Sequence, residues 1–118
     1  MMISFAYTCD ALRAGVKTVT RRQWKKGHFD KWETAWYQKR LVHKAYDRNP
    51  RNGGKHIGFL HLTHRPVMST YGDMTAEDLA AEGDLWESVE DFMTAVGATP
   101  TTPCAVIRFQ FVAKEETL

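Results

Sequence analysis

Apolar residues recur at every second position in one long segment of the chain. Between residues 105 and 112, the apolar residues Ala105, Ile107, Phe109 and Phe111 occupy alternate positions. Alternate side chains of an extended chain point to opposite faces, so this segment is predicted to be a β-strand with one buried face. Shorter apolar or β-branched stretches predict further strands over residues 3–7, 40–46 and 56–63, and a turn that enters a strand over residues 17–22.

A period of three to four residues marks the helices. Phe29, Trp32, Trp36 and Tyr37 follow an i, i+3, i+7, i+8 spacing, which predicts a helix over residues 28–39. Its aromatic stripe either packs against the sheet, which we expect of Trp32 and Trp36, or presents exposed rings on which bases stack.

Capping residues delimit three further helices. Thr8 and Gly15 bound a short one, Thr75 precedes another at residues 76–82, and a third lies within residues 85–96, where Ser88 can begin a turn and Gly97 follows. The order is strand, helix, strand, helix, strand hairpin, helices, strand. That order, in a chain of 118 residues, predicts one small α+β domain with a mostly antiparallel, partly closed sheet.

Composition changes this picture in only a few respects. No apolar run is long enough to span a membrane, and the first residues do not resemble a signal peptide. Two cysteines, Cys9 and Cys104, are too few for a disulfide framework and are expected to be buried thiols. We therefore expect a cytoplasmic protein with no membrane partner. The sequence does not indicate its oligomeric state.

Charge is distributed unevenly along the chain. Residues 1–56 hold 13 Lys and Arg against 4 Asp and Glu, whereas residues 57–118 hold 3 against 10. Two interpretations are open. Either the first half forms a basic face for a polyanion, or the two halves neutralise each other in the fold.

The segment Gly15–Trp24, GVKTVTRRQW, concentrates one lysine, two threonines and two arginines directly after a predicted helix end. Cations and hydroxyls at this density suit the binding of an anion or a nucleotide. The segment also resembles the Gly-x-Lys-Thr-x-Thr-x-Arg signature of the ASCH domain, a PUA-like family linked to RNA and modified nucleosides. The resemblance continues through AYDRNPRNGGKHIGFLHLT at 45–63 and MTAEDLAAEGD at 74–84, and it ends on AVIRFQFV.

The resemblance implies a single ASCH domain over residues 1–118, with a PUA-like, mostly antiparallel β-barrel and a few short peripheral helices. One bacterial branch of the family hydrolyses 4-acetylcytidine with a Lys, a Thr three residues later and a distant Glu. These positions match Lys17, Thr20 and Glu82 of this chain. Other members of the family are RNA binders or ribonucleases. The aromatic segment 28–39 and the turn DRNPRNGG are departures from the compact amidohydrolase pattern.

The chemistry of the three residues leaves two interpretations open. Lys17 can act as a base only if its pKa falls toward neutrality, and Thr20 as a nucleophile or water-positioning group needs such a base nearby. Glu82 would orient Lys17 or carry a proton to the leaving amine. In the alternative, Lys17 and Glu82 form a salt bridge that closes the mouth of the barrel, and loss of either residue destabilises the protein. If the three residues act as an enzyme, we expect this ion pair to be partly exposed and to contribute little to stability.

Several further residues are candidates for ligand binding. If residues 17–22 form a strand, parity places Arg22 on the face of Thr18 and Thr20, in the cleft, and Arg21 at the rim. Trp24 either stacks on a base or belongs to the core. The remaining candidates lie in or beside the basic turn: Tyr46, Arg48, Arg51 and Lys55.

No metal or cofactor is expected. His61 and His64 fall on opposite faces by alternation, and no paired-cysteine zinc signature, Walker loop or dinucleotide fingerprint is present. The leading hypothesis is a domain that binds RNA or a modified nucleoside in a cleft beside Lys17–Arg22. The alternatives are an amidohydrolase that deacylates a cytidine-type nucleoside, or a ribonuclease, and an interaction domain with a vestigial cleft. An open pocket that joins Lys17, Thr20 and Glu82 would favour the amidohydrolase, and a broad basic groove would favour the binding protein.

Overall fold

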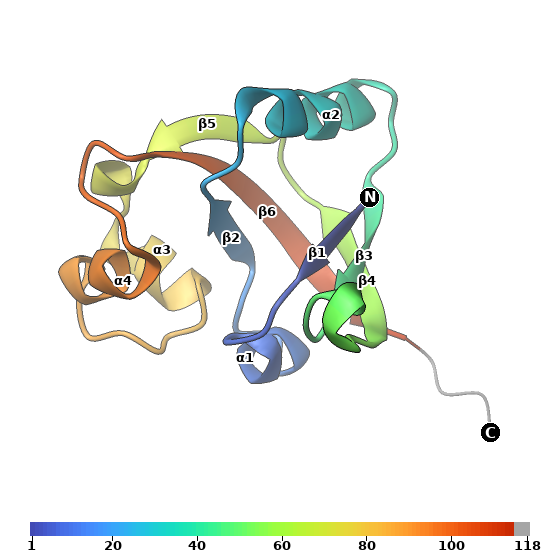
Figure 1. Ribbon diagram of the computed structural model, residues 1–118, viewed down its shortest axis with the longest axis horizontal. Coiled ribbons are helices and arrows are strands. Elements are labelled where there is room, and N and C mark those ends of the chain that lie inside the picture. Colours follow the sequence, from blue (N-terminus) through green and yellow to red (C-terminus); the bar gives the residue numbers. More distant parts are fainter. Residues whose placement is uncertain (115–118) are drawn as a thin grey trace.

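A computed structural model describes residues 1–114 and shows a mixed sheet flanked by short helices (Figure 1). The elements in chain order are β1 (Met2–Ser4), α1 (Cys9–Arg13), β2 (Val19–Arg22), α2 (Lys26–Tyr37), β3 (Val42–Tyr46), the 3₁₀ turn η1 (Pro50–Asn52), β4 (His56–Leu62), β5 (Val67–Thr70), η2 (Tyr71–Asp73), α3 (Ala76–Ala81), α4 (Val89–Val96) and β6 (Pro103–Ala113). The predicted α+β class is therefore confirmed, with the strands forming a half-barrel.

Strand β6 organises the sheet. The strand order is β1-β3-β4-β6-β2, and β5 also pairs with β6. β4 and β5 pair with successive parts of one edge of β6, while β2 pairs with its other edge. All these pairings are antiparallel, and β1 alone among the described strands pairs in parallel, with β3. Figure 1 shows β6 as the long strand that crosses the whole molecule.

Two hydrophobic clusters lie on opposite sides of β6. Ile107 and Phe109 pack with Phe5, Leu60 and Trp32 in the first cluster. The other cluster gathers residues of β2, η2, α3, α4 and the first half of β6: Val19, Tyr71, Met74, Leu79, Phe92, Met93, Cys104 and Val106. The prediction of a single buried face for β6 is thus wrong over its first half, because the helices α3 and α4 cover the second face there.

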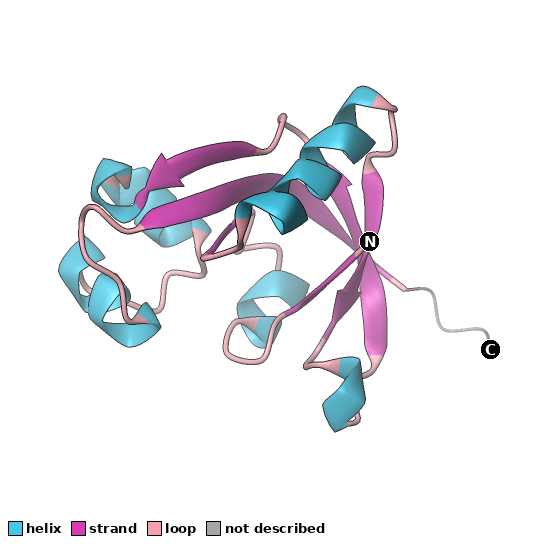
Figure 2. Ribbon diagram, turned by 45° about the horizontal axis from the view of Figure 1, so that its top comes forward, coloured by secondary structure: helices cyan, strands magenta, loops and turns pink. Residues whose placement is uncertain are grey.

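Helix α2 lies across the sheet (Figure 2). It begins two residues earlier than predicted, and Phe29, Trp32 and Ala35 are its buried residues. Trp36 is half-buried against the first cluster, whereas Tyr37 is exposed. The expectation that Trp32 and Trp36 pack against the sheet is confirmed, because Trp32 is buried and Trp36 contacts the first cluster. Removing this aromatic area from water stabilises the helix.

The capping predictions for α3 and α4 are confirmed. The Thr75 hydroxyl accepts a hydrogen bond from the Asp78 backbone N–H, and the Asp78 carboxylate accepts one in return from the Thr75 backbone. The Ser88 hydroxyl caps α4 by accepting a hydrogen bond from the Asp91 backbone N–H, and Gly97 ends the helix in the left-handed conformation at φ 70°. Gly15 also takes a left-handed φ of 77°, but Thr8 makes no side-chain cap for α1.

The first predicted strand is shorter than expected, since β1 ends at Ser4 and residues 5–8 turn toward α1. Strand β5 was not predicted, because Val67–Thr70 is only four residues long and its two apolar residues are adjacent rather than alternating. None of the helices in residues 1–114 combines the length and the apolar character that crossing a membrane requires.

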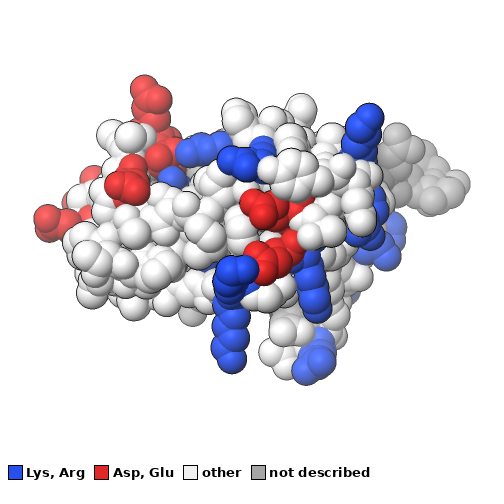
Figure 3. Space-filling view, turned by 90° about the horizontal axis from the view of Figure 1, so that it is seen from above, with Lys and Arg blue, Asp and Glu red and all other residues white. Residues whose placement is uncertain are grey.

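The charge imbalance along the sequence appears in part on the surface. In Figure 3 the acidic side chains lie mostly toward the end that holds α3 and α4, and many basic ones lie toward the other end. Acidic atoms also interrupt the basic ones in the middle of this face. The face drawn there is not a continuous basic patch.

Candidate functional site

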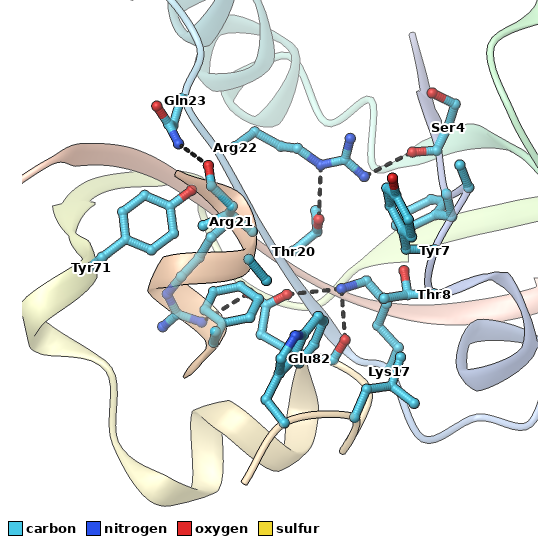
Figure 4. A pocket seen from close by; sticks show the side chains of 17 residues that line it. Ser4, Tyr7, Thr8, Lys17, Thr20, Arg21, Arg22, Gln23, Tyr71 and Glu82 are labelled. Atoms are coloured by element: carbon cyan, nitrogen blue, oxygen red, sulfur yellow. Dashed lines mark hydrogen bonds and ion pairs between the residues drawn. The ribbon is translucent and has the colours of Figure 1, made fainter. Parts of the chain in front are cut away.

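A pocket of about 690 Å³ opens where the two hydrophobic clusters meet (Figure 4). Phe5 of the first cluster and Tyr71 and Phe92 of the second all line it. Its other walls come from the β1–α1 loop, the strand β2, the end of α3 and the helix α4. The lining residues from these elements are Ser4, Ala6, Tyr7, Thr8, Lys17, Thr20, Arg21, Arg22, Gln23, Glu82, Leu85, Trp86, Ala95 and Val96. The pocket therefore brings together Lys17, Thr20 and Glu82, which are far apart in sequence.

Lys17 and Glu82 form a buried ion pair. The Lys17 Nζ donates to Glu82 Oε2 at 2.8 Å and to the Glu82 backbone carbonyl at 2.9 Å. Their side chains are 3% and 2% exposed, so the expectation of a partly exposed salt bridge is wrong. The ends of α1 and α3 bring Lys17 and Glu82 together. Gly15 turns the chain after α1, and Glu82 is the C-cap residue of α3. The Thr18 N–H donates to the Ala81 carbonyl and joins the two segments.

Arg21 extends this pair into a chain of charges. Its Nη1 donates to Glu82 Oε1 at 3.2 Å, its Nη2 lies 3.1 Å from Asp78 Oδ2, and Asp78 Oδ1 accepts from Arg108 at 2.9 Å. The placement of Arg21 at the rim is therefore wrong, because its side chain is only 4% exposed. Two carboxylates from the acidic half of the sequence draw it inward. In this ion network (Lys17, Glu82, Arg21, Asp78 and Arg108) the two halves of the chain neutralise each other.

Arg22 occupies the cleft, as strand parity predicts. Its Nε donates to Thr20 Oγ1 at 2.9 Å and its Nη2 donates to the Ser4 carbonyl at 2.8 Å. Its guanidinium carbon lies 5.2 Å from the centroid of the Phe5 ring, and Lys17 Nζ lies 5.9 Å from the same centroid. Arg22 thus bridges β2 and β1. Both acceptors of these two hydrogen bonds, the Thr20 hydroxyl and the Ser4 carbonyl, are neutral groups.

The electrostatics of the pocket favour a less basic lysine. Burial lowers the pKa of Lys17 below its ordinary value, Glu82 opposes that change, and the positive charges of Arg22 and Arg21 add to the lowering. Burial likewise raises the pKa of the Tyr71 hydroxyl, which stays protonated. It also raises the pKa of Cys104 to about 11, so this thiol is inert.

An apolar wall faces these polar groups. It comes from the helix α4 and the loop before it, and it includes Trp86, whose ring meets Phe92 edge-on at 4.7 Å between centroids. Gln23 donates to the Val96 carbonyl at 3.0 Å and so ties the end of α4 to the end of β2. Sequence reasoning missed Tyr71, Phe5 and Tyr7 as pocket residues. No motif marks them, and only the fold brings them to the site.

Trp24 lies outside the pocket. Its ring stacks on Trp32 at a centroid distance of 5.2 Å and meets the edge of His28 at 4.5 Å. It packs against the first hydrophobic cluster, in line with the core alternative. A base cannot reach the face that Trp32 covers.

The candidates around the basic turn do not join the site either. Arg48, Arg51 and Lys55 are exposed in or beside η1, at the connection of β3 to β4. Tyr46 is half-buried beside His56, with a centroid distance of 5.5 Å. None of the four lines the pocket. The structure therefore separates the basic turn from the cleft beside Lys17–Arg22.

A metal-binding cluster is not found within residues 1–114, where no group of three or more His, Cys, Asp and Glu side chains is arranged to hold an ion.

Comparisons with known proteins give a fold relationship. No family model matches the sequence, and no curated protein is similar to it. The fold resembles the crystal structure of protein EF3133 from Enterococcus faecalis V583, a DUF984 protein, with a TM-score of 0.55 and 11% identity. The match covers 88% of this chain and 66% of that one, so this chain spans about two thirds of the length of its structural neighbour. At this identity the likeness concerns the fold alone.

Proposed function

We propose that this protein is a PUA-like domain of the ASCH type whose pocket binds a nucleoside-sized molecule, with a modified cytidine as the first candidate. The observation that carries the proposal is the convergence of Lys17, Thr20, Arg22 and Glu82 on one pocket of about 690 Å³. That volume lies within the range of about 300–1,000 Å³ typical of small-molecule sites. The DUF984 family has an ASCH- and PUA-like fold, which gives the resemblance indirect support.

The walls of the pocket suit a flat ring with polar edges. Arg22 uses Nε and Nη2 on Thr20 and Ser4, and its fork keeps further N–H donors for a carbonyl oxygen of the ligand. Aromatic side chains at Phe5, Tyr71 and Trp86 provide surfaces for a base. A long RNA groove receives less support, because the cations of the basic turn lie outside the pocket.

A second candidate function is hydrolysis of an amide on such a nucleoside. It is favoured by the presence of Lys17, Thr20 and Glu82 in the same pocket. The 2.8 Å contact of Lys17 with Glu82 opposes it, because the carboxylate raises the pKa of the amine and disfavours the neutral form that a base requires. In this reaction the Thr20 oxygen, or a water that it positions, attacks the acyl carbon. Lys17 takes the proton from the nucleophile and delivers it to the leaving amine, and the acid is released after water cleaves any acyl-enzyme ester.

Two features of the pocket support this chemistry. The guanidinium of Arg22 donates to Thr20 Oγ1, which favours the ionised form of that oxygen. The lowered pKa of Lys17 brings the amine nearer to the range in which a base works at neutral pH. Glu82 accepts from Lys17 and fixes the direction of its Nζ.

Calorimetric titration with cytidine, uridine and 4-acetylcytidine tests the binding function. We expect Arg22→Gln to weaken binding by about ten- to a hundredfold, the value of one or two hydrogen bonds from a charged donor. Arg48→Gln is the matched control outside the pocket and should leave the affinity unchanged. Equal effects of the two substitutions, or no binding of any nucleoside, would contradict the proposal.

Turnover of 4-acetylcytidine, followed by the release of cytidine, tests the second candidate. Thr20→Val should abolish most turnover, while Thr18→Val, which changes an exposed hydroxyl two residues away, should retain it. A wild-type protein that binds the nucleoside without hydrolysing it would contradict hydrolysis, and binding would remain as the proposed function.

A further inference from the structure

Among residues 1–114, five aromatic side chains line the pocket, and one of them exposes almost its whole ring. The five are Phe5, Tyr7, Tyr71, Trp86 and Phe92. Phe5, Tyr71 and Phe92 are buried in the two hydrophobic clusters, and Trp86 packs partly buried against the second cluster. Tyr7 is 94% exposed. Four of the rings are therefore fixed by the core, whereas Tyr7 borders the pocket with almost no contact to the rest of the protein.

Tyr7 projects from a loop whose two ends are fixed. The Phe5 N–H donates to the Tyr46 carbonyl at 2.8 Å, and the Thr8 carbonyl accepts from the Leu12 N–H at 2.9 Å. The side chains of Phe5 and Thr8 are both buried. The Tyr7 side chain can therefore rotate without movement of the backbone on either side. A tyrosine loses little conformational freedom when it becomes fixed, because its side chain has only two rotatable torsions.

The loop between α3 and α4 borders the same opening. At Gly83 this loop touches the β1–α1 loop, since an added Cβ at Gly83 would lie 3.6 Å from Thr8 Cγ2 and 3.7 Å from Leu85 Cγ. Leu85 lines the pocket and is 57% exposed. Tyr7 and Leu85 therefore lie at the mouth of the pocket, on two loops that contact each other.

The β1–α1 loop also begins beside a charged group of the pocket. The Ser4 carbonyl accepts from Arg22 Nη2 at 2.8 Å, and Ser4 lies three residues before Tyr7 in the sequence. Figure 4 shows Ser4, Tyr7 and Arg22 on the same side of the pocket. A ligand whose polar edge binds Arg22 therefore lies on the side of the pocket that carries Tyr7.

We propose that Tyr7 determines specificity by stacking on the face of a planar ligand ring and covering the mouth of the pocket. This inference rests on the proposed function and names the residue that makes the site selective for a flat ring. Stacking would remove from water the aromatic surface that Tyr7 now exposes. Every base offers a π-face, so Tyr7 selects planarity, while Arg22 contacts the polar edge of the ring.

Calorimetric titration with uridine and dihydrouridine tests the inference. The two nucleosides share the ribose and both ring carbonyls, but saturation makes the ring of dihydrouridine non-planar and removes its π-system. The wild type should bind uridine about five- to a hundredfold more tightly, the range that stacking of one base provides. Tyr7→Ala should remove this preference, and Tyr7→Phe should retain it.

Tyr37 supplies the matched control. It is an exposed tyrosine of α2 that does not line the pocket, so Tyr37→Ala should leave both affinities unchanged. Tyr7→Ala should keep the melting temperature of the wild type, because the exposed ring contributes little to packing. A loss of binding in this variant is then not a loss of folding.

Nitration with tetranitromethane, read by peptide mass, measures the covering of Tyr7 directly. Saturating uridine should protect Tyr7 and leave the nitration of Tyr37 unchanged. Equal nitration of Tyr7 with and without uridine would contradict the inference. Protection of Tyr7 that rises with protein concentration in the absence of any nucleoside would also overturn it, because a second copy of the chain would then cover this ring.

The outcomes separate this inference from the proposed function. If Tyr7→Ala binds uridine as tightly as the wild type does, the role of Tyr7 is wrong and the proposed function stands. If no nucleoside binds, but the flat amide benzamide binds and loses affinity in Tyr7→Ala, the stacking role is right and the nucleoside is wrong. If neither the nucleosides nor benzamide bind, both proposals are overturned.

Discussion

Two regions of this molecule are equally rich in lysine and arginine, and the fold uses them in opposite ways. In the ion network, Lys17 and Arg21 are buried and each contacts a carboxylate that lies at least 57 residues away in sequence. In the basic turn, Arg51 and Lys55 are exposed, and within residues 1–114 no carboxylate lies within 4.0 Å of the charged group of either side chain. In the sequence, both regions look alike, because each concentrates lysine and arginine over a few residues.

The difference shows that position in the fold, rather than residue type, decides what a cation does. A buried cation must be paired, because an unpaired one loses its hydration without compensation. An exposed cation keeps its hydration, and a charged partner would add little. The ion network is therefore a fixed part of the pocket, while the basic turn is free to meet solvent or a partner. The following predictions test this contrast.

The largest effect is expected for Glu82→Ala. This change leaves Lys17 and Arg21 without the carboxylate that both contact, and breaking a buried pair costs about 3–5 kcal/mol. Urea unfolding measures the loss. The exposed Glu87→Ala is the control and should shift the free energy of unfolding by no more than about 0.5 kcal/mol. A loss below about 1 kcal/mol for Glu82→Ala would mean that the pair is solvated in solution.

A smaller loss is expected for Arg21→Met. Glu82 keeps Lys17 and Asp78 keeps Arg108 in this variant, so no carboxylate is left alone, and the unsatisfied Nε of Arg21 is removed as well. We expect a loss of about 1–3 kcal/mol. A double-mutant cycle with Asp78→Asn should give a coupling energy, since the two side chains share an ion pair. Additive losses would contradict the shared network.

The pH dependence of stability should reveal the contribution of the ionised Asp78 carboxylate. Burial alone would raise the pKa of this carboxyl, but hydrogen bonds from Arg108 and the Thr75 backbone and the charge of Arg21 lower it below its ordinary value of 3.8. A carboxyl with a lowered folded pKa stabilises the fold above its unfolded pKa and loses that contribution as the pH falls through the folded value. The free energy of unfolding, measured from neutral pH down into this acid range, should therefore fall more steeply for the wild type than for Asp78→Asn. Parallel curves would show that Asp78 is not held ionised by the network.

The smallest change in stability is expected for the basic turn. Arg48→Ala and Arg51→Ala should each leave the free energy of unfolding within about 0.5 kcal/mol of the wild type. If the turn meets a polyanion, each substitution should also weaken binding of a short RNA and reduce its salt dependence by about one phosphate contact. Fluorescence anisotropy at low and high salt measures this slope. An unchanged slope would leave the basic turn as a solvated loop.

Periodicity and caps predicted most of the elements, because these signals are local. Thr75, Ser88 and Gly97 lie where their side chains or φ angles are needed, and the hairpin of β3 and β4 follows from apolar strands around a Gly-rich turn. Val67–Thr70 carries no comparable signal, because its stability comes from pairing with β6 rather than from its own side chains.

The site was predictable only where a motif exists. Lys17, Thr20, Arg22 and Glu82 were identified from the sequence, and the structure places all four on one pocket. The prediction that Arg21 lies at the rim is wrong, because strand parity gives only the direction of a side chain. It does not reveal the two carboxylates, Asp78 and Glu82, that pair with Arg21 in the interior. The helix within residues 85–96 was predicted from its caps, but no local pattern says that one of its faces lines a pocket rather than the core.

Strand β6 has a consequence for how the chain reaches its native state. β2, β4 and β5 all take their hydrogen bonds from residues 103–113, which a ribosome adds after every one of those strands. Until that segment emerges, the earlier strands expose unpaired edges and neither hydrophobic cluster is complete. Folding should then be slow to start and abrupt when it comes, because the decisive contacts join distant parts of the chain.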